Sequence, residues 1–340
     1  MRPSIAAVGA LCLTASVFAF TDKTAPVIDG TVDNEYGPPA SVQNVGTDFG
    51  NSDLGVVDWA NGSEVDVGHA IVLDGFLYLF LGGNLESNYN KLEVFIDCKA
   101  GGQNRLRGDN RDVDFNGLNR MGDDGSANGL TFDEGFAADY WLGVTCGGPT
   151  FTVYSNCAEL LTDGGEGAGG YLGSAGATVA MVAGNGIEIA LNNSNIGGVP
   201  FGSDAASGKG VTTGVEFKIP VSVLGYTSGP IRVCAFINGG GHDFLSNQVL
   251  AGCGAGQDFL GEPRTVNFNN VPGDQWFVVP GTDAAPCPAD LNSDGVVDGT
   301  DLGLLLGDWG VFGSPADINQ DGTVDGTDLG LLLGDWGTCG

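Results

Sequence analysis

Short hydrophobic runs alternate with polar, glycine-rich segments over residues 24–282. The runs are rich in β-branched and aromatic residues, and clusters of Gly, Asn and Asp separate them. They read HAIVLD, FLYLFLGG, KLEVFIDC, YWLGVTC, FTVYSNC, ATVAMVA, GIEIAL, GVEFKIP, IRVCAFIN and DQWFVVP. Apolar and polar residues alternate with period two in KLEVFID and GVEFKIP, as they do in a strand that buries one face. The pattern predicts a mainly β protein with a large antiparallel β-sandwich over 24–282. The glycine-rich segment Ala100–Gly135 is predicted to lie over one edge as a loop.

The pattern changes at the end of the chain, where one stretch occurs twice. Cys287–Gly310 and Ser314–Gly337 begin 27 residues apart and share the run VDGTDLGLLLGDWG. After the polar part of each copy, apolar residues recur at helical spacing. They are Leu302, Leu305, Leu306 and Trp309 in the first copy, and Leu329, Leu332, Leu333 and Trp336 in the second. We predict one short helix per copy with this stripe buried.

The polar part of each copy has the spacing of a twelve-residue calcium loop. Side-chain oxygens fall at positions 1, 3, 5, 9 and 12, glycine stands at position 6, and position 7 offers its backbone carbonyl. The predicted ligands are Asp290, Asn292, Asp294, Val296, Asp298 and Asp301, and then Asp317, Asn319, Asp321, Thr323, Asp325 and Asp328. We therefore predict two bound Ca²⁺ ions and a tail whose folding depends on them.

A calcium loop followed only by its exiting helix, and then duplicated, resembles the type I dockerin module. Pro288 and Pro315 stand where an entering helix would be, and the resemblance covers Cys287–Cys339. It implies a small all-α module (287–340) after a short linker (283–286), with a cohesin-like or cell-surface protein as partner. A calcium-stabilised stalk with no partner is the alternative, because the two predicted helices carry no basic residue.

Three stretches of the larger region are similar to family 9 carbohydrate-binding modules and their DOMON-like relatives. They are APVIDGTVDNEY (Ala25–Tyr36), the strand pair of Leu77–Asp97 that ends in NKLEVFID, and GVEFKIPVSVLG (Gly214–Gly225). The resemblance implies a jelly-roll arrangement of the strands and a noncatalytic domain that binds a sugar or a surface.

Sugar binding requires aromatic faces at a concave surface, and five residues are candidates: Trp59, Trp141, Trp276, Tyr89 and Tyr140. Aromatic residues in strand-like runs are usually core, so Trp141 and Trp276 are expected to be buried. Tyr89 lies in the polar turn ESNYN. Trp59, in the polar run VDWANGSE, is the predicted sugar-binding residue.

Charge and the N-terminus restrict the possible partners and location. A net charge of −30 argues against nucleic acid and anionic membranes as partners. Met1-Arg2, the apolar run Ile5–Phe18 and the small-residue site near Ala19 predict a signal peptide over 1–19. No later run is long enough for a membrane helix, so we expect a secreted protein without membrane insertion, associated with the cell surface only through other molecules.

Seven cysteines follow the signal peptide, and in an exported protein they favour disulfides. They are Cys98, Cys146, Cys157, Cys234, Cys253, Cys287 and Cys339. Cys287 and Cys339 bracket the duplicated module, and we predict a disulfide between them. Cys146 with Cys157 and Cys234 with Cys253 are local candidates, and the full connectivity stays open.

Residues for catalysis are few. The chain has two histidines, His69 and His242, and we expect His242 to be a hydrogen-bonded structural residue. Glu93 and Asp97 lie on one face of a predicted strand, which does not make the opposed carboxylate pair of a glycosidase. We predict a noncatalytic calcium-binding protein attached through its tail, with a sandwich that binds carbohydrate. The alternative is a component of polysaccharide breakdown, either a glycan-binding protein or a glycoside hydrolase carried by a dockerin.

Overall fold

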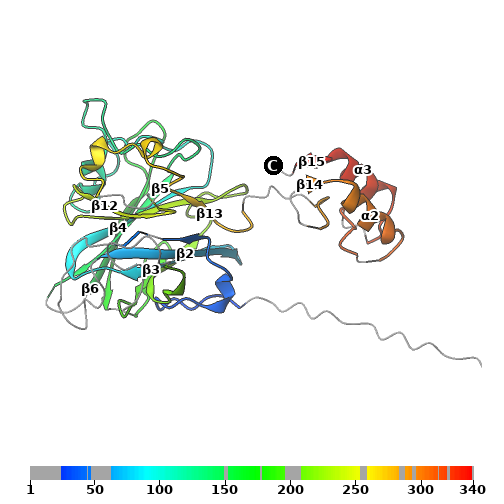
Figure 1. Ribbon diagram of the computed structural model, residues 1–340, viewed down its shortest axis with the longest axis horizontal. Coiled ribbons are helices and arrows are strands. Elements are labelled where there is room, and N and C mark those ends of the chain that lie inside the picture. Colours follow the sequence, from blue (N-terminus) through cyan, green and yellow to red (C-terminus); the bar gives the residue numbers. More distant parts are fainter. Residues whose placement is uncertain are drawn as a thin grey trace, which may run out of the picture.

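The computed structural model describes residues 24–43, 45–46, 63–148, 152–176, 178–195, 208–252, 259–282, 288–292, 296–312, 314–319 and 322–338. Over these residues the protein is mainly β, and its long strands form two antiparallel sheets that face one another (Figure 1). The predicted mainly β class is confirmed. The predicted signal peptide (1–19) and linker (283–286) lie outside the described residues.

The first sheet has six strands in the order β1-β2-β3-β10-β9-β8. Their bounds are β1 (Ser41–Val42), β2 (Glu64–Leu73), β3 (Phe76–Asn84), β8 (Met181–Val182), β9 (Glu188–Leu191) and β10 (Gly214–Pro220). Asp74 and Gly75 join β2 to β3, and both have positive φ, 51° and 80°. A two-residue hairpin loop of this conformation favours Asp-Gly because glycine and aspartate tolerate the left-handed region.

The second sheet places its strands in the order β12-β11-β4-β5-β6-β7, and β13 also pairs with β11. Their bounds are β4 (Asn88–Asp97), β5 (Tyr140–Gly147), β6 (Thr152–Glu159), β7 (Gly169–Gly176), β11 (Arg232–Asn238), β12 (Leu245–Leu250) and β13 (Phe277–Val278). β7 (GGYLGSAG) and β12 (LSNQVL) were not predicted, because neither has a hydrophobic run. The run ATVAMVA contributes only the two residues of β8.

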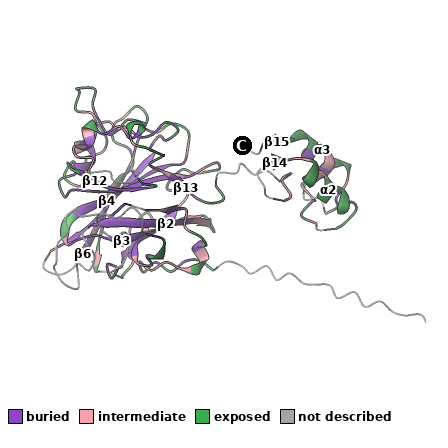
Figure 2. Ribbon diagram, viewed as in Figure 1, coloured by how far each residue is buried: buried purple, intermediate pink, exposed green. Residues whose placement is uncertain are grey.

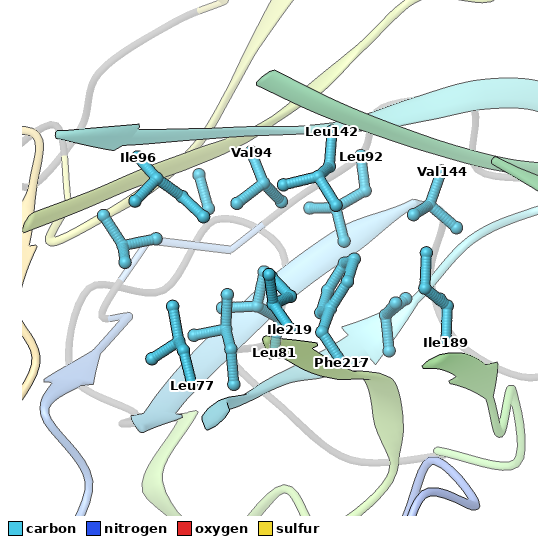
Figure 3. Close-up of a cluster of buried hydrophobic side chains, with 14 of the residues drawn as sticks. Leu77, Leu81, Leu92, Val94, Ile96, Leu142, Val144, Ile189, Phe217 and Ile219 are labelled. Atoms are coloured by element: carbon cyan, nitrogen blue, oxygen red, sulfur yellow. The ribbon is translucent and has the colours of Figure 1, made fainter. Parts of the chain in front are cut away.

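The inner faces of the two sheets meet in one large apolar core. Alternate residues of β4 point into it, namely Leu92, Val94 and Ile96. Figure 3 shows these side chains, with Leu142 and Val144 of β5, facing side chains such as Leu77, Phe217 and Ile189 of the first sheet. The period-two pattern of KLEVFID therefore identifies the face that points into this core, but the outward residues Glu93 and Phe95 are buried as well, so β4 is covered on both faces.

The N-terminal stretch APVIDGTVDNEY packs on the outer side of the first sheet. Tyr36, at the end of the 3₁₀ turn η1 (Asn34–Tyr36), donates its hydroxyl to Glu216 Oε1 of β10 at 2.8 Å. Glu216 Oε2 accepts the backbone N–H groups of Asp29 and Gly30, each at 3.0 Å. Burial raises the pKa of Glu216 to about 7, although these donors oppose the shift. Glu216 therefore anchors this stretch to the sheet.

The segment Ala100–Gly135 was predicted to be a loop over one sheet edge, and that prediction is wrong. Its apolar residues pack on the outer face of the second sheet and form a second buried core with Phe95, Trp141 and Phe236. The insert contributes Leu106, Val113, Leu118, Met121, Leu130 and Phe132. The insert contains one helical turn, α1 (Gly117–Arg120). Three 3₁₀ turns lie elsewhere in the chain: η3 (Gly208–Gly210) before β10, and η4 (Pro263–Thr265) and η5 (Phe268–Asn270) after β12. The high glycine content of this segment favoured a loop prediction, although its scattered apolar residues are enough to form a core.

The tail contains the two predicted helices, α2 (Gly299–Gly307) and α3 (Gly326–Gly334), and a short antiparallel pair, β14 (Val296–Val297) with β15 (Gly337–Thr338). Asp298 caps α2 by accepting the N–H of Thr300 at 2.7 Å, and Asp325 caps α3 in the same way. These caps fix where both helices begin. No helix among the described residues has both the length and the apolarity to cross a bilayer.

The predicted buried stripe of each helix is only partly correct. Leu305 and Leu332 are fully buried in the tail's own small core, with Ala289, Val297, Ala316 and Val324, while Leu302 and Leu329 are half-buried. Leu306, Trp309, Leu333 and Trp336 are exposed, as are Leu304 and Leu331. Figure 2 shows exposed segments on both α2 and α3. Two nine-residue helices packed on one side cannot cover the three consecutive leucines of each LLL run.

Candidate functional site

The outer face of the second sheet carries the candidate site. Antiparallel partners point to the same face, so the strand register arranges outward side chains in rows. One row contains Lys91, Thr145 and Tyr154, and the next contains Glu93, Gly143, Asn156 and Tyr171. The rows cross β4, β5, β6 and β7.

The second core covers one end of this face, and the other end is hollowed into a pocket of about 950 Å³. Its walls come from β4 to β7, from the Asp114–Arg120 part of the insert and from the loop Gly240–His242. A volume of this order is typical of ligand sites. The pocket therefore lies beside the part of the sheet that the insert covers, with the Asp114–Arg120 part of the insert as one of its walls.

Aromatic rings stand around this pocket. Tyr171 of β7 and Phe115 of the insert are exposed, and Tyr89 at the start of β4 is about half exposed. The rings of Tyr89 and Tyr154 have centroids 6.4 Å apart. A Cβ on Gly147 would collide with the Tyr89 ring, so glycine at this position leaves room for that ring to lie against β5.

His242 joins the elements that form the pocket floor. Its Nδ1 lies 2.7 Å from Glu93 Oε1, and its Nε2 lies 2.8 Å from Asp114 Oδ2. Lys91 Nζ donates to the same Asp114 oxygen at 2.7 Å. The network holds an insert residue, a strand residue and a loop residue in fixed positions. His242 is hydrogen-bonded, as predicted, and it is also buried.

The titration of this network follows from its geometry. Burial by itself lowers the pKa of His242, but the Glu93 carboxylate and the hydrogen bonds to Asp114 and Glu93 raise that pKa to about 9. Burial likewise raises the pKa of Asp114, but His242 and Lys91 outweigh it and bring the pKa to about 2. At neutral pH the pocket floor therefore contains an imidazolium and an ionised Asp114.

This raised pKa predicts a pH-dependent stability. A histidine whose pKa is near 6.5 unfolded and about 9 folded stabilises the folded state fully below pH 6.5. The contribution, about 3 kcal/mol from the size of the shift, is lost as pH rises through 9. Urea unfolding at pH 6 and pH 10, followed by tryptophan fluorescence, should show this loss.

The variant His242→Gln should lack the His242 part of this loss. His69→Gln is the matched control, because burial lowers the pKa of His69 and this histidine contributes nothing on the alkaline side. Identical pH profiles for wild type and His242→Gln would contradict the charge assignment.

The backbone around the pocket is unusually constrained. Eight non-glycine residues of the described chain have positive φ, and five of them line this pocket: Tyr89, Asp114, Phe115, Asn116 and His242. Three of the five are consecutive. A Cβ on the next residue, Gly117, would collide with the His242 ring. Strained backbone gathered at one place is typical of functional sites.

Glu93 lies beneath the pocket, fully buried. Besides His242, it accepts hydrogen bonds from Trp141 Nε1 at 2.8 Å and from Asn238 Nδ2 at 3.2 Å. A Cβ on Gly143 would lie 2.5 Å from the Trp141 indole, so glycine at this position leaves room for the ring to lie over Gly143. Glu93 thus connects the second core to the pocket.

The five aromatic residues considered for sugar binding lie in different environments. Trp141 is core, as expected, and Tyr140 is buried. Trp276 was also expected to be buried, but it is only half-buried, packed against the second core. Tyr89 was expected in a polar turn, but it is the second residue of β4 and lines the pocket. Trp59, the predicted sugar-binding residue, lies outside the described residues.

Sequence reasoning missed Phe115, Tyr154, Asn156 and Tyr171. The strand period could have located Tyr154 and Asn156. Val153 is an apolar residue that is buried in the core, so the residues at the alternate positions, Tyr154 and Asn156, point to the outer face of the sheet. Phe115 and Tyr171 had none, because their surroundings read as glycine-rich loop.

The predicted calcium loops are partly described, and their acidic residues are engaged in loop hydrogen bonds. Asp317 Oδ2 accepts the N–H of Gly322 at 2.8 Å, which ties position 6 of the second loop to position 1. Asp301, at position 12, accepts the backbone N–H of Leu291 at 2.8 Å and of Asp298 at 2.9 Å. Asp328 accepts the N–H of Asp325 at 2.7 Å. Position 12 therefore closes each loop onto the start of its helix.

The predicted ligands of these loops fit calcium, because every one of them would coordinate through an oxygen atom of its side chain or backbone carbonyl. Among the described residues, no three His, Cys, Asp or Glu side chains gather closely enough to hold a metal. Asp294 and Asp321, at position 5 of each loop, lie outside those residues. The two calcium sites stay a prediction.

The local cysteine pairing Cys146–Cys157 is wrong. β5–β6 pairing puts Cys146 opposite Val153 and Cys157 opposite Leu142, so the two cysteines are four residues out of register. That offset is about 13 Å along the strand, beyond the reach of a disulfide. Cys98, Cys146, Cys157 and Cys234 form no disulfide with one another. Cys253, Cys287 and Cys339 lie outside the described residues, and so does the predicted disulfide between the last two.

Fold and site together define a class: an antiparallel two-sheet protein with an open pocket on the outer face of one sheet, followed by a duplicated loop–helix tail. The chain matches no family model, no curated protein and no solved structure.

Proposed function

We propose that this is an exported, noncatalytic protein that binds carbohydrate in the His242 pocket and is attached through a calcium-loaded tail. The observation that carries the proposal is the open pocket itself, with tyrosine rings beside fixed polar groups. Sugars present apolar ring faces and polar hydroxyls, so they fit a surface that offers aromatic faces and hydrogen-bonding groups together. The resemblance to carbohydrate-binding modules with a jelly-roll sandwich supports the same function.

The pocket lining favours binding over hydrolysis. Glycoside hydrolysis ordinarily needs two carboxylates on opposite sides of the scissile bond. Asp114 is the single carboxylate among the described lining residues, and Lys91 and His242 both bind its Oδ2. Release of reducing sugar from a glycan panel would instead support the hydrolase alternative.

The tail is proposed to be a dockerin-like attachment module. When bound, Ca²⁺ would neutralise the crowded carboxylates of each loop, and Asp290, Asn292, Asp294, Val296, Asp298 and Asp301, with their six counterparts from Asp317 to Asp328, would hold it. Each copy of the repeat leaves the same three apolar side chains exposed, two on its helix and one just after it: Leu304, Leu306 and Trp309, and Leu331, Leu333 and Trp336. Exposed apolar side chains that recur in both copies support docking to a cohesin-like or cell-surface protein.

Removing one pocket ring tests the carbohydrate proposal. Tyr171→Ala should weaken retention of the full-length protein on its glycan by about threefold to tenfold, because one stacked aromatic ring contributes on the order of 0.5–1.5 kcal/mol. Affinity electrophoresis against a polysaccharide panel gives the measurement.

Phe312→Ala is the control for this test, because it removes a similarly exposed ring from the tail. It should leave retention unchanged. If no polysaccharide retains the wild type, or if Tyr171→Ala binds as well as wild type, the His242 pocket is not a carbohydrate site.

A further inference from the structure

The pocket collects positive charge in a strongly acidic protein. The whole chain has 12 Lys and Arg against 42 Asp and Glu. Three of those twelve, Lys91, Arg120 and Arg264, line this pocket together with His242, against the single lining carboxylate of Asp114. Such a concentration of cations is opposite in sign to the protein as a whole.

His242 adds a fourth positive charge on geometric grounds. A neutral imidazole has one N–H, so one of its nitrogens would present a lone pair to a carboxylate. Here both nitrogens face carboxylate oxygens, at 2.7 Å and 2.8 Å. Both nitrogens therefore donate, and the ring is an imidazolium.

Both arginines are held in place while keeping donors for a ligand. Glu262 binds Arg120 in a fork, with Nη1 at 2.7 Å and Nη2 at 2.6 Å from its two oxygens. Arg264 donates from Nε to the Gly122 carbonyl at 2.8 Å and from Nη2 to the Asn119 carbonyl at 3.2 Å. A guanidinium has five N–H donors, so these contacts leave several on each side chain.

The local charge is balanced when the ion-pair partners are included, whereas the protein as a whole is strongly negative. The four cations Lys91, Arg120, Arg264 and His242 meet four carboxylates, those of Glu93, Asp114, Glu262 and Asp124, the last at 3.7 Å from Arg264, so the charges cancel. The pocket is also rich in hydrogen-bond donors. Its chemistry suits a ligand that brings acceptors and a negative charge.

We propose that the ligand of this pocket is an anionic saccharide, a sugar whose carboxylate or sulfate group binds Arg120 and Arg264 while its ring lies against the tyrosines. The proposal rests on the carbohydrate-binding function proposed above and narrows its ligand class. A planar carboxylate or a sulfate accepts two parallel hydrogen bonds from a guanidinium.

Calorimetry with the full-length protein tests the ligand class. Three oligosaccharides of equal length are titrated: one of uronic acid units, one neutral, and the neutral one sulfated. We expect at least one anionic ligand to bind ten times more tightly than the neutral one, with an affinity that falls as salt rises. The carboxylate and sulfate arms show which group the pocket takes.

Variants connect that preference to the pocket. Arg120→Gln should remove most of the tenfold preference, and Arg120→Lys, which retains the charge, should keep part of it. Arg105→Gln is the matched control, because it removes the same charge from an exposed position of the same insert and should change nothing. Thermal unfolding of each variant shows that the insert remains folded.

The outcomes separate the two proposals. Equal or tighter binding of the neutral oligosaccharide, or an unchanged preference in folded Arg120→Gln, overturns the anionic ligand and leaves carbohydrate binding in place. Binding of none of the three oligosaccharides counts against carbohydrate binding itself and the anionic ligand with it.

Discussion

Removal of calcium from the full-length protein is expected to unfold α2 and α3 and to leave the two-sheet region folded. The tail's buried core has six residues, two of them alanine, which is too little apolar surface for a unit of this size to be stable by itself. The acidic loops would then repel themselves without a cation. At a thousandfold excess over its Kd, each ion stabilises the folded tail by about 4 kcal/mol. Circular dichroism before and after EDTA should show loss of helix with the β signal retained.

Variants of each loop separate the two ions. Asp294→Ala and Asp321→Ala should each reduce the calcium stoichiometry from two to one in a titration of the full-length protein. Asp335→Ala, at the C-terminal end of α3 and outside either loop, should still bind two. A tail that keeps its full helix signal in EDTA would contradict the calcium proposal.

Replacing Glu93 by alanine is expected to destabilise the two-sheet region by about 3 to 5 kcal/mol, the usual cost of removing one partner from a buried ionic network. The change leaves the Trp141 indole N–H, the Asn238 amide and the His242 imidazolium without their shared acceptor. Each is buried, so water cannot easily replace the carboxylate. Denaturant unfolding followed by tryptophan fluorescence measures the loss, and the pocket floor should lose its ligand affinity at the same time.

Glu188→Ala is the control for this measurement. Glu188 pairs with Lys218 at 2.7 Å on the first sheet, but both side chains are about a quarter exposed, so the pair contributes about 1 kcal/mol or less. A Glu93→Ala protein no less stable than Glu188→Ala would show that the buried network does not hold the pocket together.

Strands with local patterns were predictable from the sequence. β4 and β10 alternate with period two because one side of each faces the core, and the Asp74-Gly75 turn follows from the φ values that such residues tolerate. The glycine-rich β7 was not predictable, because it is a strand through its pairing with β6 and not through its own side chains. A strand of this kind has no hydrophobic signal.

The tail helices show where local prediction ends. Their starts were determined by the sequence, since Asp298 and Asp325 cap the residues that follow them. Their buried faces were not, because Leu306 and Trp309 fit the helical period but have no partner in the described tail core to cover them. Periodicity identifies a helix, while packing decides which of its apolar residues are buried.

By itself, the sequence determined the mainly β class, the period of the strands and the repeated acidic loops, because each of these depends on residues close together in the chain. Tertiary structure alone decided the pocket. Its central histidine meets Glu93 across 149 positions and Asp114 across 128, and the insert that carries Asp114 reads locally as glycine-rich loop. No local propensity records such contacts, since they form only when the insert packs its own apolar residues onto the outer face of the second sheet.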